Sequence, residues 1–284
     1  MCTVLTISAL VIDISALRQV ASTRRSAISS SSTSLGLIVG PEDVPNTLPS
    51  TESVPKWVND VNKALVNSIK DLLAGQFEGE GREYARFYAL ETIARVPYFS
   101  YTSVLHLYET TGHFRNKDYI RLHFNESWNE LHHLLIMESL GGAAIFYDRL
   151  VAVHLAFFYY WAVVVMFMIS PAAAYNFNSH VENHAYATYD AFLTEHAEEL
   201  KGLPVPEVAK DYYDGSKSYF SDRSFLSEDK GLVVHRPEEE EASAAPLTSL
   251  YDVFVRIRDD EAEHAHTMTL LERRAAKNSM FGSE

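Results

Sequence analysis

Two short segments of the chain repeat the same arrangement of a carboxylate and an imidazole. Glu130 stands three residues before His133, and Glu261 stands three residues before His264. Three residues of an α-helix turn through about 300°, so the glutamate and histidine of each pair project to one side and can bind one metal ion. A chain rich in both residue types produces such a pair by chance, so one pair alone is weak evidence for a metal site.

Two further glutamates each stand alone on an otherwise apolar helical face. Glu91 lies among Phe87, Tyr88, Ala94 and Tyr98, and Glu182 lies with Ala185, Tyr186 and Tyr189. An unpaired carboxylate inside a helical bundle costs several kcal/mol, and metal coordination compensates for that cost. The order Glu, Glu-x-x-His, Glu, Glu-x-x-His on four helices is the ligand set of ferritin-like di-iron and di-manganese bundles. The sequence therefore predicts an all-α, ferritin-like four-helix bundle with six metal ligands: Glu91, Glu130, His133, Glu182, Glu261 and His264.

The ligand chemistry also indicates the metal. Carboxylates with two imidazoles suit iron or manganese, and iron is preferred where oxygen must be activated. The competing interpretation is that the four helices carry solvated faces whose spacing is coincidental, and it requires that coincidence four times. The ligand chemistry by itself therefore leaves two iron ions or two manganese ions as the expected cofactor.

The last helix contains a second, overlapping pair, Glu263 and His266. Glu261 and His264 continue a mostly apolar stripe, whereas Glu263 and His266 share their face with charged residues, so the first pair is expected to face the core. The stripe comprises Phe254, Ile257, Ala265, Met268 and Leu271, and the charged face comprises Arg256, Asp259, Arg273 and Arg274.

A polar residue stands four positions before each of the two ligand histidines. These residues are Asn129, before His133, and Asp260, before His264. Each can accept a hydrogen bond from its own imidazole and fix the ring, as residues behind metal ligands commonly do. Exposure of either side chain to solvent is nearly as good an interpretation.

Four segments around these residues resemble the plastid terminal oxidase branch of the alternative oxidases. The segments span residues 86–98, 126–138, 181–189 and 257–264, and the likeness covers roughly residues 54–270. It implies a quinol:oxygen oxidoreductase of electron transport that oxidises plastoquinol and reduces dioxygen to water at a di-iron centre. It also implies monotopic attachment to the thylakoid membrane of a plastid such as the chloroplast; the mitochondrial inner membrane is the alternative.

The resemblance also assigns roles to residues that bind no metal. Tyr189 matches the redox-active tyrosine of the family. Arg86, Leu90, Ala185 and Thr188 match positions that line its quinone pocket. The fork of donors on the Arg86 guanidinium would orient the quinol headgroup.

Two other functions use the same ligands. A membrane-associated di-iron hydroxylase or desaturase would insert oxygen or remove hydrogen, and local ligand spacing does not separate it from an oxidase. A ferritin-like iron store would be a non-enzymatic alternative, and it should lack the apolar and amphipathic segments described next.

Residues 54–73 predict an amphipathic helix that could pack on a core or lie in a membrane interface. Its apolar positions are Val54, Trp57, Val58, Val61, Leu65, Ile69 and Leu72. Further helices are expected over residues 82–112 with a bend at Pro97, over 118–140, from Pro171 to about 200, and from Ser249 to about 277. Residues 202–246, rich in proline and acidic residues, are expected to form an irregular insertion.

Residues 150–169 are apolar and long enough to cross a bilayer. A crossing would separate Glu91, Glu130 and His133 from the other three ligands, and one centre could not collect all six. We therefore expect this segment to pack along the bundle or bend at the interface, with residues 157–161 at headgroup depth.

The remaining composition limits the partners. The formal charge of −14 argues against nucleic acid as a partner. Cys2 is the only cysteine, which excludes an intrachain disulfide and an iron–sulfur cluster. Residues 1–40 have the composition of a transit or targeting segment, or else of a disordered tail, and residues 41–53 form a linker to the di-iron domain at 54–284. The sequence is compatible with a homo-oligomer.

Overall fold

The structure, a computed structural model, describes residues 54–77, 79, 81–113, 117–213 and 246–277. These residues form helices and their connections, with no strand among them, which confirms the all-α class. The helices are α2 (Lys56–Gln76), α3 (Glu83–Ala94), α4 (Val96–Thr111), α5 (Lys117–Ser139), α6 (Phe146–Ile169), α7 (Pro171–Lys201), α8 (Glu207–Tyr213) and α10 (Leu250–Lys277). The predicted targeting segment and linker lie outside the described residues.

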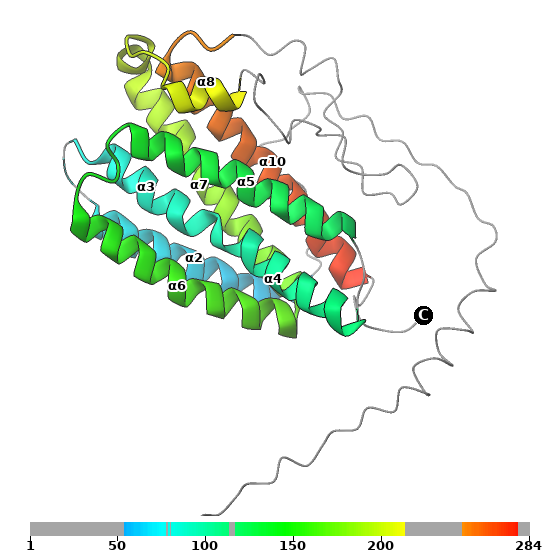
Figure 1. Cartoon of the computed structure of the whole chain (residues 1–284). Helices are drawn as coiled ribbons and strands as arrows, with labels where there is room; N and C mark the ends of the chain where they lie inside the picture. Colours follow the sequence, from blue (N-terminus) through cyan, green and yellow to red (C-terminus); the bar gives the residue numbers. More distant parts are fainter. Residues whose placement is uncertain (1–53, 78, 80, 114–116, 214–245, 278–284) are drawn as a thin grey trace, which may run out of the picture. The chain divides into compact units, whose positions relative to one another are not determined.

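Four of these helical segments form the bundle that carries the predicted ligands. α5 packs against α3 and α4, α7 packs most extensively against α10, and α3 also contacts α7 (Figure 1). Buried side chains from the four ligand-bearing helices fill the space between them, including Phe87 of α3, Ile136 of α5, Tyr189 of α7 and Phe254 of α10. The predicted ferritin-like bundle is therefore confirmed.

The ends of the helices follow the signals in the sequence. The expected bend at Pro97 is a break at Arg95, between α3 and α4, which places the proline in the first turn of α4. Gly141 ends α5 with a positive φ of 88°. A Cβ at Gly142 would lie 2.4 Å from the carbonyl oxygen of Tyr84, so this glycine permits α3 to approach the turn after α5.

Side chains cap the two long helices that form the main pair. The Ser170 hydroxyl accepts a hydrogen bond from the Ala173 backbone N–H at the start of α7, at 3.2 Å. At the start of α10, Asp252 Oδ2 accepts from the backbone N–H groups of Thr248 and Ser249, at 2.8 and 3.0 Å. Both predicted helix starts are thus confirmed.

The amphipathic helix α2 turns much of its apolar stripe outward. Trp57, Val61 and Leu72 are 50–69% exposed, whereas Asn62 and Val66 on the opposite face are buried. α2 packs mainly on α7, and the buried side of the contact is partly polar because Asn62 donates to Asn176 at 2.8 Å. α2 therefore packs on the bundle mainly through residues outside the exposed part of the stripe, and its place in a membrane interface, the second alternative, remains a prediction.

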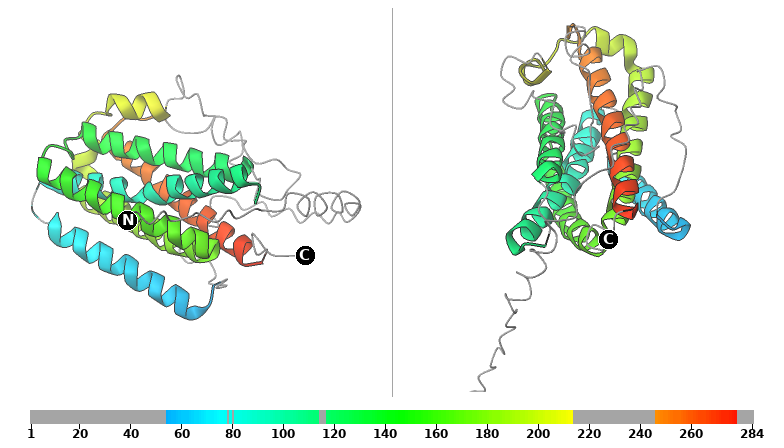
Figure 2. Two further views of the ribbon diagram at one scale, coloured as in Figure 1. Left: turned by 60° about the horizontal axis from the view of Figure 1, so that its bottom comes forward. Right: turned by 90° about the vertical axis from the view of Figure 1, so that its right-hand side faces the viewer.

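The apolar helix α6 packs along the bundle against α3, α4 and α7. It is the one described helix long and apolar enough to cross a membrane, with a mean hydropathy of 2.1, and 17% of that stretch is buried. Ala152, Val163 and Phe167 face the protein, while Phe157 and Trp161 are 57% and 55% exposed. α2 and α6 lie along the same side of the bundle (Figures 1 and 2).

Part of the segment expected to be irregular is ordered. Residues 207–213 form α8, which packs on α5, and Val205 and Ala209 are buried in the core. The Leu250 backbone N–H donates to the Leu203 carbonyl at 3.0 Å, which joins this segment to the start of α10. A helix of seven residues that begins directly after Pro206 is too short to show a sustained period in the sequence. Residues 214–245 lie outside the described part of the chain.

Candidate metal centre

The bundle brings the six predicted ligands together in its interior. α3 contributes Glu91, α7 contributes Glu182, and α5 and α10 each contribute one Glu-x-x-His pair. Their exposed fractions are 0%, except for 7% at His264. Whether these residues bind metal remains a prediction, but the sequence pattern identified the side chains that share this core.

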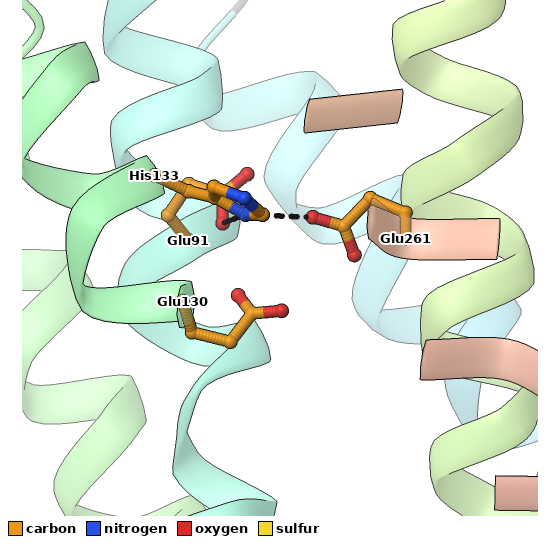
Figure 3. A group of neighbouring side chains, drawn as sticks. All are labelled: Glu91, Glu130, His133 and Glu261. Atoms are coloured by element: carbon orange, nitrogen blue, oxygen red, sulfur yellow. Dashed lines mark hydrogen bonds and ion pairs between the residues drawn. The ribbon is translucent and has the colours of Figure 1, made fainter. Parts of the chain in front are cut away.

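The ligand atoms form two overlapping groups. Glu91, Glu130, His133 and Glu261 form the first, and Glu130, Glu182, Glu261 and His264 form the second; within each group the ligand atoms lie within 4.8 Å of one another. Figure 3 shows the four side chains of the first group, which converge from α3, α5 and α10. Glu130 and Glu261 belong to both groups, so two neighbouring cations could share them.

Each histidine contacts the glutamate of the other pair. His133 Nδ1 lies 3.1 Å from Glu261 Oε1, and His264 Nδ1 lies 2.8 Å from Glu130 Oε1. This crossing arises because α5 and α10 face each other across the bundle. The two pairs therefore act as one site rather than as two separate sites.

The arrangement fits cations because it leaves buried oxygens without donors. Glu91, Glu130, Glu182 and Glu261 each have a buried Oε2 that accepts no hydrogen bond. Burying an acceptor without a partner is costly, and four such carboxylate oxygens at one place repel one another. Bound cations would compensate for both costs, and carboxylate oxygens with two imidazoles are suitable donors for iron.

The pKa shifts of the carboxylates also indicate a site that suits cations. Burial, together with the charges of Glu261 and Glu130, holds the pKa of Glu91 well above its usual range. Burial and the charge of Glu130 raise the pKa of Glu182 to about 7. Burial also raises the pKa of Glu130, but His264 and His133 outweigh it and the net shift is downward. Without cations, Glu91 therefore retains its proton near neutral pH and Glu182 retains its proton in part, whereas Glu130 does not.

The pKa values of the two histidines are raised because buried carboxylates lie beside them. Burial alone would lower the pKa of His133, but its contact with Asp260 and the charges of Glu130 and Glu91 raise it to about 9. Burial likewise opposes the charge on His264, whose pKa rises to about 10 because Glu130 is adjacent. Metal binding would displace these protons, since imidazole binds metal in its neutral form.

Asp260 orients a histidine other than the one expected. The prediction placed it behind His264 on its own helix, whereas its Oδ2 lies 3.2 Å from Nε2 of His133 on α5. The same oxygen accepts hydrogen bonds from Asn129 Nδ2 and from the Tyr213 hydroxyl, both at 3.0 Å. The expectation that each polar residue accepts from the histidine on its own helix is therefore wrong for Asp260, and Asn129 donates to Asp260 instead.

Two buried tyrosines hold the outer glutamates of the site. The Tyr189 hydroxyl donates a short hydrogen bond to Glu91 Oε1, and its ring stacks on Phe87 with centroids 4.5 Å apart. On the opposite side, the Tyr98 hydroxyl donates to Glu182 Oε1 at 2.6 Å, and Asn178 donates to the same oxygen at 3.0 Å. Sequence reasoning missed this role of Tyr98; its place seven residues after Glu91, about two helical turns along the same predicted helix, was the available signal.

The overlapping pair on α10 has the predicted register. Glu261 and His264 face the core, whereas His266 is exposed. Ile257, Met268 and Leu271 of the same stripe are fully buried. The alternative pair of Glu263 and His266 therefore points away from the site.

The structure places the four predicted quinol-pocket residues on two neighbouring helices. Arg86 and Leu90 lie on α3, and Ala185 and Thr188 lie on α7, which contacts α3. Arg86 is exposed, Leu90 and Thr188 are half-buried, and Ala185 is fully buried. Burial and then the charges of Lys70 and Arg86 lower the pKa of His184, so the Arg86 guanidinium approaches α7. Their role in binding quinol remains a prediction.

Comparison with known proteins identifies related sequences. A sequence model of the family described as "Alternative oxidase" matches residues 51–272. Ubiquinol oxidase 4, chloroplastic/chromoplastic, from Arabidopsis thaliana is 48% identical over 223 residues, which are 77% of this chain and 60% of that protein. Alternative oxidase 2, mitochondrial, from Candida albicans is 26% identical over 207 residues, 70% of this chain and 49% of its own length. The chain thus spans about half to three fifths of the length of these relatives.

Proposed function

Because the chain belongs to the alternative oxidase family, we propose that it is a quinol oxidase that reduces dioxygen to water at a non-haem di-iron centre. The observation that carries this proposal is the convergence of six buried ligands from four helices, with an unpartnered oxygen on each glutamate. Two bound irons would supply the electron transfer to dioxygen. Complete reduction consumes two quinols for each dioxygen.

The residues of the chain divide the work around that centre. Glu91, Glu130, His133, Glu182, Glu261 and His264 would hold the irons, with Glu130 and Glu261 shared because they belong to both groups. Asp260 keeps the His133 ring in place from α10. Tyr189, which donates to Glu91, would provide an electron and a proton close to the centre.

The quinol would bind on the side where α3 meets α7. Arg86 and Leu90 belong to α3 and Ala185 and Thr188 belong to α7, two helices in contact, and this supports the proposal. Tyr189 on α7 donates to Glu91 on α3. The exposed guanidinium of Arg86 can donate two parallel hydrogen bonds to oxygen atoms of the quinol headgroup. We propose plastoquinol as the donor and a plastid as the location, and the chloroplastic relative with 48% identity supports both.

The outward apolar faces of α2 and α6 support attachment to one face of the thylakoid membrane. Trp57 and Leu72 on α2 and Phe158 and Trp161 on α6 are exposed, and the two helices lie along the same side of the bundle (Figure 2). All six ligands meet in one site although α6 separates them in sequence, so α6 would lie in the interface rather than cross. Tags placed near Gly141 and Ser170 should be accessible from the same membrane face; accessibility from opposite faces would contradict this topology.

The proposed activity is tested on the purified chain after iron loading. We expect about two bound irons and oxygen uptake that depends on quinol, with water as the sole oxygen product. An oxygenated or desaturated organic product would instead identify a hydroxylase or desaturase. Iron uptake without quinol turnover would identify an iron store.

A further inference from the structure

A second buried network of titratable side chains lies beside the metal centre and is not part of it. His123 and Glu126 are on α5 and Tyr175 is on α7, and their exposed fractions are 0%, 6% and 0%. His123 Nδ1 lies 2.9 Å from Glu126 Oε2, and His123 Nε2 lies 2.9 Å from the Tyr175 hydroxyl. None of the three belongs to either group of metal ligands.

One tautomer of His123 satisfies both contacts. In this tautomer Nδ1 carries the hydrogen that the Glu126 carboxylate accepts. Nε2 of the neutral imidazole is then an acceptor, and the Tyr175 hydroxyl donates to it. The Tyr175 phenol therefore has a base in contact with it, and Glu126 stabilises the imidazolium that forms if that base takes the proton.

Tyr98 connects this network to the metal centre. Its hydroxyl donates to Glu182 at 2.6 Å, and its ring centroid lies 5.5 Å from that of His264. The same ring lies 6.4 Å from His123, which in turn lies 5.6 Å from the ring of Tyr175. An unbroken series of aromatic rings thus runs from a predicted ligand to Tyr175.

The neighbouring Tyr101 shows why Tyr175 differs from other buried tyrosines. Tyr101 is fully buried and its ring lies 5.1 Å from both His123 and Tyr175. Its hydroxyl, however, donates to the backbone carbonyl of Ala174 at 2.9 Å. A carbonyl oxygen is too weak a base to take a phenolic proton. Oxidation of a tyrosine to a neutral radical requires the proton to leave with the electron, so Tyr175 is suited to it and Tyr101 is not.

We propose that Tyr175 is a redox-active tyrosine, with His123 as its proton acceptor and Tyr98 as its electronic connection to the metal centre. The inference rests on the proposed quinol oxidase function, since dioxygen reduced at the centre is the oxidant. One electron leaves Tyr175 for the centre by way of Tyr98, and the phenolic proton moves to His123 Nε2. The products are a neutral tyrosyl radical and an imidazolium paired with Glu126. When quinol next reduces the centre, the electron returns by the same route and the proton returns from His123.

This arrangement would let the protein complete oxygen reduction when only one quinol has arrived. Tyr189 is joined directly to Glu91, whereas Tyr175 is connected to Glu182 through His123 and Tyr98. Each can supply one electron and one proton. Tyr175 is the more remote of the two, so its radical is separated from bound quinol.

Electron paramagnetic resonance tests the proposal. The reduced, iron-loaded protein is mixed with dioxygen in the absence of further quinol and frozen rapidly. Wild type is expected to give a tyrosyl radical signal that contains a Tyr175 component, identified by its loss in Tyr175→Phe. Tyr101→Phe, at the matched buried position without a base, is expected to keep that component.

A second measurement is made on the radical of the wild-type protein. In wild-type protein with isotope-labelled histidine, the radical is expected to show magnetic coupling to an imidazole nitrogen, and His123→Gln is expected to remove it. An unchanged signal in Tyr175→Phe, or a wild-type radical without histidine coupling, would overturn the inference. If oxygen uptake with quinol is normal but no Tyr175 radical forms, this inference alone fails; absence of quinol-dependent uptake overturns the proposed function as well.

Discussion

The two halves of the candidate centre use the same Glu-x-x-His pattern but are held in place differently. On the Glu91 side, His133 contacts Asp260, which also receives hydrogen bonds from Asn129 and Tyr213. On the Glu182 side, hydrogen bonds hold the carboxylate instead, from Tyr98 and Asn178. The Glu91 half is therefore held at its imidazole and also at its carboxylate, which accepts from Tyr189, whereas the Glu182 half is held at its carboxylate. Identical local spacing does not imply identical support.

The largest effect is expected from removing the outer carboxylate of the second half. Glu182→Ala should eliminate binding of the iron in that half and all quinol-dependent oxygen reduction, because no other described carboxylate takes its place in that group. Iron content and oxygen uptake measure the result. Glu195→Ala, at an exposed position on the same helix, is the matched control and should behave as wild type. Normal iron and turnover in Glu182→Ala would refute the assignment.

The register of α10 gives a second large contrast. His264→Ala should abolish quinol oxidation, because His264 is buried against Glu130, whereas His266→Ala should retain most of it, because His266 is exposed. Both variants are assayed for turnover with equal protein concentrations. The reverse outcome would show that α10 is rotated and would also remove Asp260 from its place beside His133.

The stability of the metal-free protein is expected to depend on pH through the second half. Glu182, with a pKa of about 7, stays protonated in the folded chain while the unfolded chain ionises, so stability falls as pH rises from about 4.5 towards 7. His264, with a pKa of about 10, contributes stability below its unfolded pKa of about 6.5 that is lost as pH rises towards 10. Both pKa values are raised in the folded chain, so both groups make it less stable as pH rises.

Thermal unfolding of metal-free protein between pH 5 and pH 9 checks this sum. Over this range the free energy of unfolding is expected to fall by on the order of 3 kcal/mol. Each pKa unit corresponds to about 1.4 kcal/mol, and the two contributions do not simply add because the buried groups are coupled. Iron loading should remove most of the dependence, since metal replaces the protons. A metal-free protein that becomes more stable with rising pH would contradict the electrostatic account of the site.

The smallest effect tests the unequal support of the two halves. Asp260→Ala should lower iron affinity by about 10–100-fold, the usual result of removing a residue that orients a metal-bound histidine. Asn178→Ala should lower it less, because Tyr98 still donates to the same oxygen of Glu182. Competition with a chelator measures both affinities. Equal losses in the two variants would mean that the halves are supported alike.

The sequence by itself determined which residues form the candidate centre. Spacing of three residues on a helix places Glu130 with His133 and Glu261 with His264, and burial of Glu91 and Glu182 follows from their apolar neighbours. The apolar stripe of α10 was sufficient to choose between His264 and His266. Helix periodicity is a local property, and these conclusions required nothing more.

Only the tertiary structure decided which residues of one helix support the candidate ligands of another. Asp260 orients His133 on α5 rather than His264 on its own helix, and Tyr98 reaches Glu182 on α7. The stripe of α2 faces outward because the helix packs on α7 through the opposite side, at Asn62 and Val66. Periodicity states which residues share a face, but the neighbour of that face depends on how distant helices pack, and this packing has no signature in local spacing.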